Sequence, residues 1–112
     1  MDDCIFCKIA NKQIPVTAIY EDEHFIAFHD LTPQAPVHAL VIPKAHFATL
    51  MELQETEIMA GALRAVQKTA LALDLAEEGF RMVINCRENG GQTVYHLHFH
   101  LLGGRFMQWP PG

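Results

Sequence analysis

Proline, glycine and acidic residues divide the chain into short apolar segments. The pattern in the first half predicts a helical turn followed by three strands, at residues 4–9, 18–21, 24–29 and 37–42. Asp22-Glu23 separates the first two strands and predicts a hairpin. Residues 30–36 carry two prolines and predict a loop, and Pro43 ends the third strand.

The clearest periodic pattern covers residues 55–73. Apolar residues recur there at spacings of three and four, and they predict one buried stripe made of Met59, Ala62, Leu63, Val66, Ala70 and Leu73. Glu55 and Glu57 fall at the amino end, where the helix dipole favours acidic side chains. The pattern therefore predicts an amphipathic helix that packs on one face of a sheet.

Residues 80–86 and 93–101 predict the last two strands, with Asn89-Gly90-Gly91 as a short turn between them. Strands joined by so short a turn run antiparallel. The 112 residues suffice for one sheet and one helical layer. We therefore predict an α+β fold in a single domain over residues 1–112: an antiparallel meander of about five strands with one long helix and a short amino-terminal helix.

Three of the seven histidines alternate along the last predicted strand. His96, His98 and His100 therefore share one face, and the apolar residues between them share the other. A polar sheet face, a metal site and a catalytic site are the three interpretations. The outer pair lies roughly 13 Å apart on a regular strand, so the three cannot all bind one tetrahedral zinc. We favour catalysis, with one imidazole as nucleophile or base and its neighbours orienting it and holding negative charge.

The segment before these histidines supports that interpretation. Gly90 and Gly91 allow backbone amides to approach an anion closely, and Thr93 adds a hydroxyl three residues before His96. Glycine pairs are also common in ordinary hairpins, so they carry weight only beside the histidines. Together the two features predict a cradle for a phosphate or an oxyanion.

Composition narrows the class of partner and the location. The net charge is −5, with no run of five like charges, which argues against nucleic-acid binding. The acidic start, Met1-Asp2-Asp3, lacks the basic and apolar parts of a signal peptide, and no apolar stretch is long enough to span a membrane. Three cysteines do not suggest a disulfide framework, so we expect a cytoplasmic protein.

The segment from His96 to Leu102 is similar to the His-φ-His-φ-His-φ-φ signature of the histidine triad superfamily, where φ is apolar. Other stretches resemble, in the same order, the histidine triad nucleotide-binding protein branch: residues 28–36, 40–44, 90–96 and 102–112. The resemblance covers essentially the whole chain. It implies one histidine triad (HIT) domain, whose sheet continues across a homodimer.

This resemblance also implies an activity, the hydrolysis of purine nucleoside phosphoramidates such as adenosine monophosphate linked to an amine. His98 would be the nucleophile and form a nucleotidyl-histidine, His100 would contact the phosphate, His96 would support the site, and His38 would be a fourth, outlying histidine. A dinucleoside polyphosphate hydrolase and a nucleotide-binding regulatory protein are the alternatives. A transferase is less favoured, because that branch has Gln where this chain has His100.

The nucleotide contacts implied by the resemblance fall into two groups. Those for the phosphate and the leaving group are Asn85, Gly91, Gln92 and Thr93. Those for the purine and ribose are Ile5, Phe6, Ile9, Phe28, His29, Asp30 and Leu31. Ile5, Ile9 and Phe28 can equally be core residues. Thr93 replaces the serine usual in this branch, and its methyl group narrows the space for a leaving group.

The chain also contains Cys4-Ile-Phe-Cys7, a spacing used in zinc sites and in thiol redox chemistry. Some bacterial members of the superfamily bind zinc through such a pair and two histidines. That resemblance implies a structural zinc on Cys4, Cys7, His46 and His96, while catalysis itself requires no cofactor. Two buried apolar thiols are the alternative, and a redox protein is a weaker one.

Overall fold

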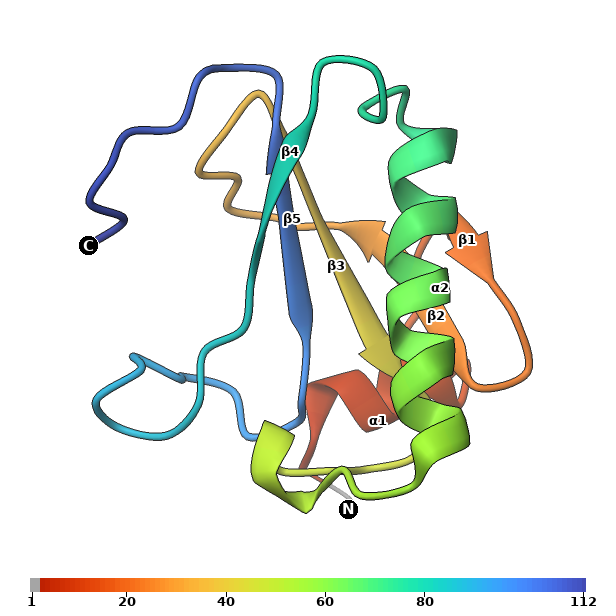
Figure 1. Ribbon diagram of the computed structural model, residues 1–112. Helices are drawn as coiled ribbons and strands as arrows, with labels where there is room; N and C mark the ends of the chain where they lie inside the picture. The colour runs from red at the N-terminus through yellow and green to blue at the C-terminus, as the bar shows by residue number, and fades with distance from the viewer. Residues whose placement is uncertain (1–2) are drawn as a thin grey trace.

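A five-stranded antiparallel sheet with the spatial order β1-β2-β3-β5-β4 forms the centre of the computed structural model, which describes residues 3–112. Its strands are β1 (Tyr20–Glu21), β2 (Phe25–His29), β3 (Val37–Pro43), β4 (Phe80–Val83) and β5 (Phe99–Gly103). Met1 and Asp2, from the acidic start, lie outside the described residues. The predicted α+β meander is confirmed (Figure 1).

Helices cover both faces of this sheet. The long helix α2 (Thr56–Ala72) lies on one face, while the short helix α1 (Ile5–Ala10) lies behind the other, near the end of β3 (Figure 1). A short 3₁₀ helix, η1 (Leu50–Glu52), precedes α2 and was not predicted. None of the helices in residues 3–112 is long and apolar enough to cross a membrane.

The buried stripe of α2 differs from the predicted one. Ala62, Val66 and Ala70 are buried as expected, but Met59 and Leu63 are 43% and 55% exposed. Ala65 and Thr69 are buried instead. The face of α2 that packs on the sheet is therefore made mainly of small side chains, and the larger Met59 and Leu63 lie outside it.

The last two strands are shorter than predicted, and the expected strand over residues 93–101 is wrong in its start. β5 begins only at Phe99, which pairs with Val41 of β3. In that register Leu97 would pair with Pro43, which has no backbone N–H to donate to the ladder. The Leu97 amide instead donates to the Phe47 carbonyl at 2.6 Å, so residues 96–98 extend past the sheet.

The connection between β4 and β5 is also not the short turn predicted from the glycines. It is an irregular loop over residues 84–98, since β4 ends at Val83 and not at residue 86. Gly90 is required inside this loop because a Cβ there would lie 2.5 Å from the Cys86 carbonyl oxygen. The loop, α1 and the chain after β3 meet at one end of the sheet (Figure 1).

Two apolar clusters fill the interior, one on each side of the sheet. The larger lies between α2 and the sheet and includes Leu97, Phe99 and Leu101, the apolar residues that alternate with the histidines. The smaller packs Phe6 and Ile9 of α1 against β2 and β3. The predicted alternation is therefore present, and the three histidines lie on the side of α1.

Candidate active site and metal cluster

A pocket of about 540 Å³ opens on the side of the sheet that α1 covers. Ten predicted site residues line it: Ile5, Phe6, Ile9, Phe28, His29, Asp30, Leu31, Thr93, His98 and His100. Its lining combines apolar side chains with the imidazoles of His98 and His100 and the carboxylate of Asp30. Such a pocket suits a ligand with a flat apolar part and a polar or charged part.

Part of the pocket wall was missed in the sequence. Residues 14–17, between α1 and β1, line it together with Thr32, Leu40 and Val94. In the sequence, Ile14-Pro15 indicates a break in secondary structure, because proline biases the preceding residue away from helix. Its apolar side chains in an otherwise polar connection were the available signal, since a solvent-exposed linker gains nothing from them.

His98 is held in one orientation by the main chain. Its Nδ1 lies 2.7 Å from the carbonyl oxygen of His96, and the side chain is buried. A carbonyl can only accept a hydrogen bond, so Nδ1 carries the proton and donates it. The lone pair is therefore on Nε2, the atom that a nucleophile or base needs.

A chain of hydrogen bonds sets the proton positions on the next two histidines. The Gln34 amide donates to His38 Nδ1 at 3.0 Å, so the proton of neutral His38 is on Nε2. His38 Nε2 lies 2.9 Å from His100 Nδ1 and donates to it. His100 therefore carries its own proton on Nε2 and can donate from there to an anion in the pocket.

Asp30 lies beside this chain. Its Oδ2 is 3.5 Å from His38 Nε2, and its Oδ1 accepts from the amide and the hydroxyl of Thr32. Asp30, His38 and His100 together have the residue types of a metal site. The Gln34 amide keeps His38 Nε2 protonated, so this group is arranged for hydrogen bonding and does not suit a metal.

Burial keeps His100 neutral. It lowers the pKa of His100 to about 4, and the neighbouring His98 and His38 add to the shift while Asp30 opposes it. In the unfolded chain the pKa returns to about 6.5. A neutral His100 imidazole in the pocket acts as a hydrogen-bond donor and brings no fixed positive charge.

This pKa predicts a pH dependence of stability. Between pH 6.5 and about 4 the unfolded chain binds a proton that folded His100 does not, so the free energy of unfolding falls as the pH is lowered through this window. In His100→Gln the proton uptake on unfolding should be smaller by up to about one proton, which denaturant titrations at several pH values measure. The control is His24→Gln, an exposed histidine outside the pocket. Equal slopes for wild type and His100→Gln would contradict the assignment.

The remaining residues predicted to contact a phosphate form hydrogen bonds that hold the loop over residues 84–98 in place. Gln92 is buried, and its side chain accepts from the Arg87 amide and donates to the carbonyls of Ala48 and Val94. The Asn85 side chain donates to the Gly90 carbonyl, and the Gly91 and Gln92 amides donate to Glu88 and Arg87. Asn85, Gly91 and Gln92 do not line the pocket, whereas Thr93 does.

The structure also brings together Cys4, Cys7, His46 and His96. Their donor atoms all lie within 4.8 Å of one another. His96 Nδ1 is 3.2 Å from Cys4 Sγ and 3.6 Å from Cys7 Sγ, and His46 Nδ1 is 3.3 Å from Cys7 Sγ. In a tetrahedral zinc site, sulfur and nitrogen ligands lie roughly 3.6 Å apart. The donor set and its spacing therefore fit zinc.

The proton positions fit a cation as well. His96 Nε2 donates to the Pro43 carbonyl at 2.8 Å, which leaves Nδ1 unprotonated and facing the two sulfurs. Burial lowers the pKa of His96 to about 4, so this imidazole is neutral. Burial and the adjacent Cys4 sulfur raise the pKa of the Cys7 thiol. A bound divalent cation would compensate for the cost of deprotonating it.

Comparison with known proteins identifies the family of this chain. The model of the HIT domain matches residues 11–107. The chain belongs to the HIT domain family. A HIT family hydrolase from Legionella pneumophila has the same fold, with a TM-score of 0.93, 50% sequence identity and coverage of 98% of this chain and 100% of that chain.

Two plant relatives of this HIT domain carry informative names. The 14 kDa zinc-binding protein of Brassica juncea is 48% identical, over 98% of this chain and 100% of its own. Adenylylsulfatase HINT1 of Arabidopsis thaliana is 47% identical, over 96% of this chain and 76% of its own. These names support a HIT family hydrolase with a group of residues able to bind a metal.

Proposed function

We propose that this protein hydrolyses purine nucleoside phosphoramidates, with adenosine monophosphate linked to an amine as the model substrate. The observation that carries the proposal is the hydrogen bond from His98 Nδ1 to the His96 carbonyl, 2.7 Å long. It leaves the Nε2 lone pair of a buried, pocket-lining imidazole available for attack on phosphorus. A phosphoryl centre also needs positioning and charge stabilisation, which the pocket provides.

The reaction then takes two steps. In the first, His98 Nε2 forms a bond to the α-phosphorus, the bond between phosphorus and the amine nitrogen breaks, and the amine leaves with a proton taken up from solvent. In the second, water attacks the phosphorus and returns a proton to solvent, the bond to His98 breaks, and the nucleoside monophosphate is released. His100 Nε2–H donates to a phosphate oxygen in both steps, oriented by its contact with His38.

The rest of the pocket suits the nucleoside. Asp30 offers carboxylate oxygens to the ribose hydroxyls, and Phe6 and Phe28 form an apolar wall against which a purine ring packs. We assign to Asn85, Gly91 and Gln92 the role of holding the loop over residues 84–98 in shape. The side chains of Asn85 and Gln92 and the amides of Gly91 and Gln92 form hydrogen bonds with other residues of this loop. Thr93 lines the pocket directly and offers its hydroxyl near the leaving group.

Sulfate is a second leaving group to compare with an amine. The Arabidopsis thaliana relative is named an adenylylsulfatase, and release of sulfate from adenylyl sulfate would form the same adenylyl-His98. A diadenosine polyphosphate would also form it. Rates on these three substrates rank the alternatives, and the proposal expects the phosphoramidate to react fastest.

Mass spectrometry of the protein quenched during turnover of an adenosine phosphoramidate tests the proposal directly. We expect the added mass of one adenylyl group on the peptide that contains His98. The same experiment on His24→Gln, which alters an exposed histidine outside the pocket, should show the same adduct. An adduct on another residue, or turnover with no adduct under rapid quenching, would contradict the mechanism.

We also propose that Cys4, Cys7, His46 and His96 hold a structural zinc ion. Their donor set and spacing fit it, and a relative is named a zinc-binding protein. Four protein ligands leave no open position, so the ion would stabilise the fold near the pocket. A cytoplasmic location is part of this proposal, because free thiols at all three cysteines are typical of a reducing compartment.

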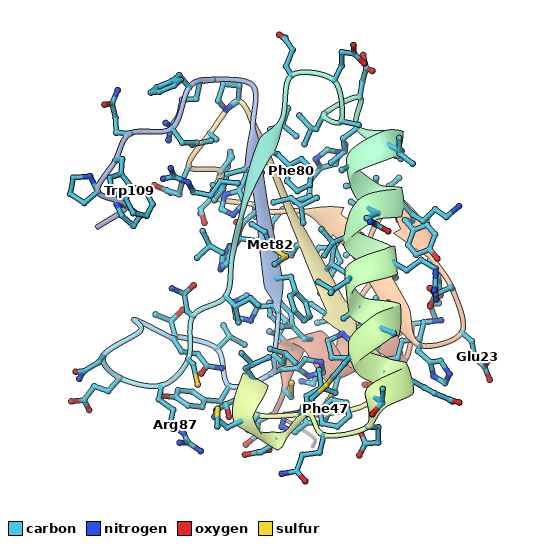
Figure 2. All side chains as sticks on the ribbon, viewed as in Figure 1. Glu23, Phe47, Phe80, Met82, Arg87 and Trp109 are labelled. Atoms are coloured by element: carbon cyan, nitrogen blue, oxygen red, sulfur yellow. The ribbon has the colours of Figure 1, made fainter. Side chains whose placement is uncertain are left out.

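A homodimer is the further part of the proposal. Within residues 3–112, β4 pairs only with β5 and leaves one edge of the sheet open. Phe80 and Met82 lie on this strand (Figure 2). Their exposed fractions are 38% and 37%. Apolar side chains on an open edge favour pairing with a second copy.

Sedimentation tests the dimer. We expect Met82→Glu to convert the protein to monomers at micromolar concentration, because a charge would be buried without a partner. The matched control is Met51→Glu, which makes the same change at a residue 61% exposed in η1, away from this edge. Unchanged sedimentation of Met82→Glu would place the interface elsewhere.

A further inference from the structure

We propose that Cys4 and Cys7 form a redox modification site: a small hydroperoxide oxidises them to a disulfide, which releases the metal, detaches the His96 imidazole from the sulfurs and lowers turnover at His98. The inference rests on the proposed hydrolase and its zinc site. It adds to them a control of the reaction by thiol oxidation.

The two thiols are placed for a disulfide. Cys4 is the N-cap residue of α1, and Cys7 lies in the first turn. A disulfide needs Cβ atoms about 3.5–4.5 Å apart. The two sulfurs already lie within 4.8 Å of one another, and the Cys7 amide lies 3.3 Å from Cys4 Sγ. Closing the bond therefore requires only a small movement of the first turn of α1.

The two thiols also differ in access. Cys4 is partly exposed, whereas Cys7 is buried behind it. A small oxidant therefore reaches Cys4 first, and Cys7 is in position to react with the oxidised Cys4. The third cysteine, Cys86, lies in the loop over residues 84–98 and outside the cluster. Cys86 is therefore the matched control for oxidation of Cys4 and Cys7.

The same turn of α1 contacts the catalytic imidazoles. Phe6 lies between the two cysteines in sequence, is 7% exposed, and its ring centroid is 5.7 Å from that of His96 and 5.2 Å from that of His98. The His96 imidazole contacts both sulfurs, while the His96 carbonyl holds His98. A movement of the cysteines therefore reaches the nucleophile through Phe6 and through His96.

The chemistry needs one equivalent of hydroperoxide. The Cys4 thiolate attacks the terminal oxygen, the O–O bond breaks, and an alcohol or water leaves as Cys4 becomes a sulfenic acid. Cys7 sulfur then attacks the Cys4 sulfur, the S–S bond forms, and hydroxide leaves and takes up a proton as water. In total the two thiols lose two protons and two electrons, and the peroxide is reduced to an alcohol or water and one further water. The disulfide no longer supplies two thiolate ligands, so zinc is released.

The experiment uses the full chain with Cys86→Ser, loaded with zinc and treated with hydrogen peroxide. We expect the loss of two hydrogens by mass, the release of one zinc per chain to a chromogenic chelator, and at least about a tenfold loss of phosphoramidate turnover, since a misplacement of ~1 Å can cost 10²-fold. Dithiothreitol and zinc should reverse all three changes. Adding Cys7→Ser should prevent the disulfide and leave a sulfenic acid on Cys4 that a dimedone probe labels.

Reduced, zinc-free protein separates the disulfide from simple loss of metal. Its thiols keep their contacts with His96, so its turnover should exceed that of the oxidised protein. Equal turnover of these two forms, or a disulfide that leaves turnover within twofold of the reduced protein, would overturn the inference, as would failure of the disulfide to form. If the reduced protein had no turnover, the proposed hydrolase would fail, and disulfide formation and zinc release would still decide whether the modification site exists.

Discussion

Replacement of His98 by alanine should lower phosphoramidate turnover by at least about 10³–10⁴-fold, because losing a nucleophile leaves only binding and charge stabilisation. Nucleotide affinity should change little. The pocket wall of Ile5, Phe6 and Phe28 is intact in this variant, and Asp30 keeps its hydrogen bonds to Thr32. A steady-state assay and a titration with adenosine monophosphate measure the two quantities.

His98→Asn is the sharper form of this test. Its amide can still donate to the His96 carbonyl, so the local geometry is better preserved than in the alanine variant. Asparagine has no lone pair that can attack phosphorus, so turnover should be lost to a similar degree. Turnover retained by both variants would rule out His98 as the nucleophile. Loss of nucleotide binding in both would show that the substitutions disturb the pocket.

Removal of zinc should give the largest change in stability. A ligand present at a thousandfold excess over its Kd adds about 4 kcal/mol to the free energy of unfolding. In a domain of this size that corresponds to a decrease of roughly 15 °C or more in Tm when a chelator is added. Differential scanning calorimetry with and without chelator measures it, and elemental analysis of protein purified without chelator gives the zinc content. Less than about a tenth of an equivalent per chain would end the zinc assignment.

The expected decrease in stability on removal of zinc has a local cause at α1. α1 spans only Ile5–Ala10, and a helix so short is not stable by itself in water. Packing of Phe6 and Ile9 on the sheet and the contacts of the two cysteines hold it in place. Hydrogen exchange should therefore increase first in α1 when the metal is removed. Cys7→Ser should reproduce the effect, and Cys86→Ser should not.

The regular part of the fold could be predicted from the sequence because each element has a simple periodic pattern. α2 spans Thr56–Ala72 against a predicted range of 55–73, and β3 spans Val37–Pro43 against 37–42. The exposure of Met59 and Leu63 could not be predicted, because the rotation of a helix about its own axis depends on the partner surface. The same limit applies to the start of β5, which depends on Pro43 in a strand distant in sequence.

The sequence predicted which residue types make up the candidate site. It did not predict how the residues of the loop over residues 84–98 are used. The alternation of histidines indicated a polar face, and the family resemblance supplied the two cysteines and His46 as their neighbours. Gln92 is an example of a role that the sequence leaves open. Its amide group has the right chemistry for a phosphate, and in the structure it connects the loop over residues 84–98 to Ala48 and also donates to Val94 within that loop. Only the path of the backbone decides between these uses.

The carbonyl of His96 has a consequence for how this protein tolerates mutation. Every amino acid supplies the same oxygen at that position, so no ordinary substitution deletes the group that orients His98. The imidazole of His96 is thereby left for a separate task beside the sulfurs. An ester in place of the peptide bond after residue 96 weakens this acceptor, and a chain assembled by chemical ligation makes the experiment accessible. The same ester removes the Leu97 N–H that donates to the Phe47 carbonyl, so a second ester that removes only another loop amide is its control.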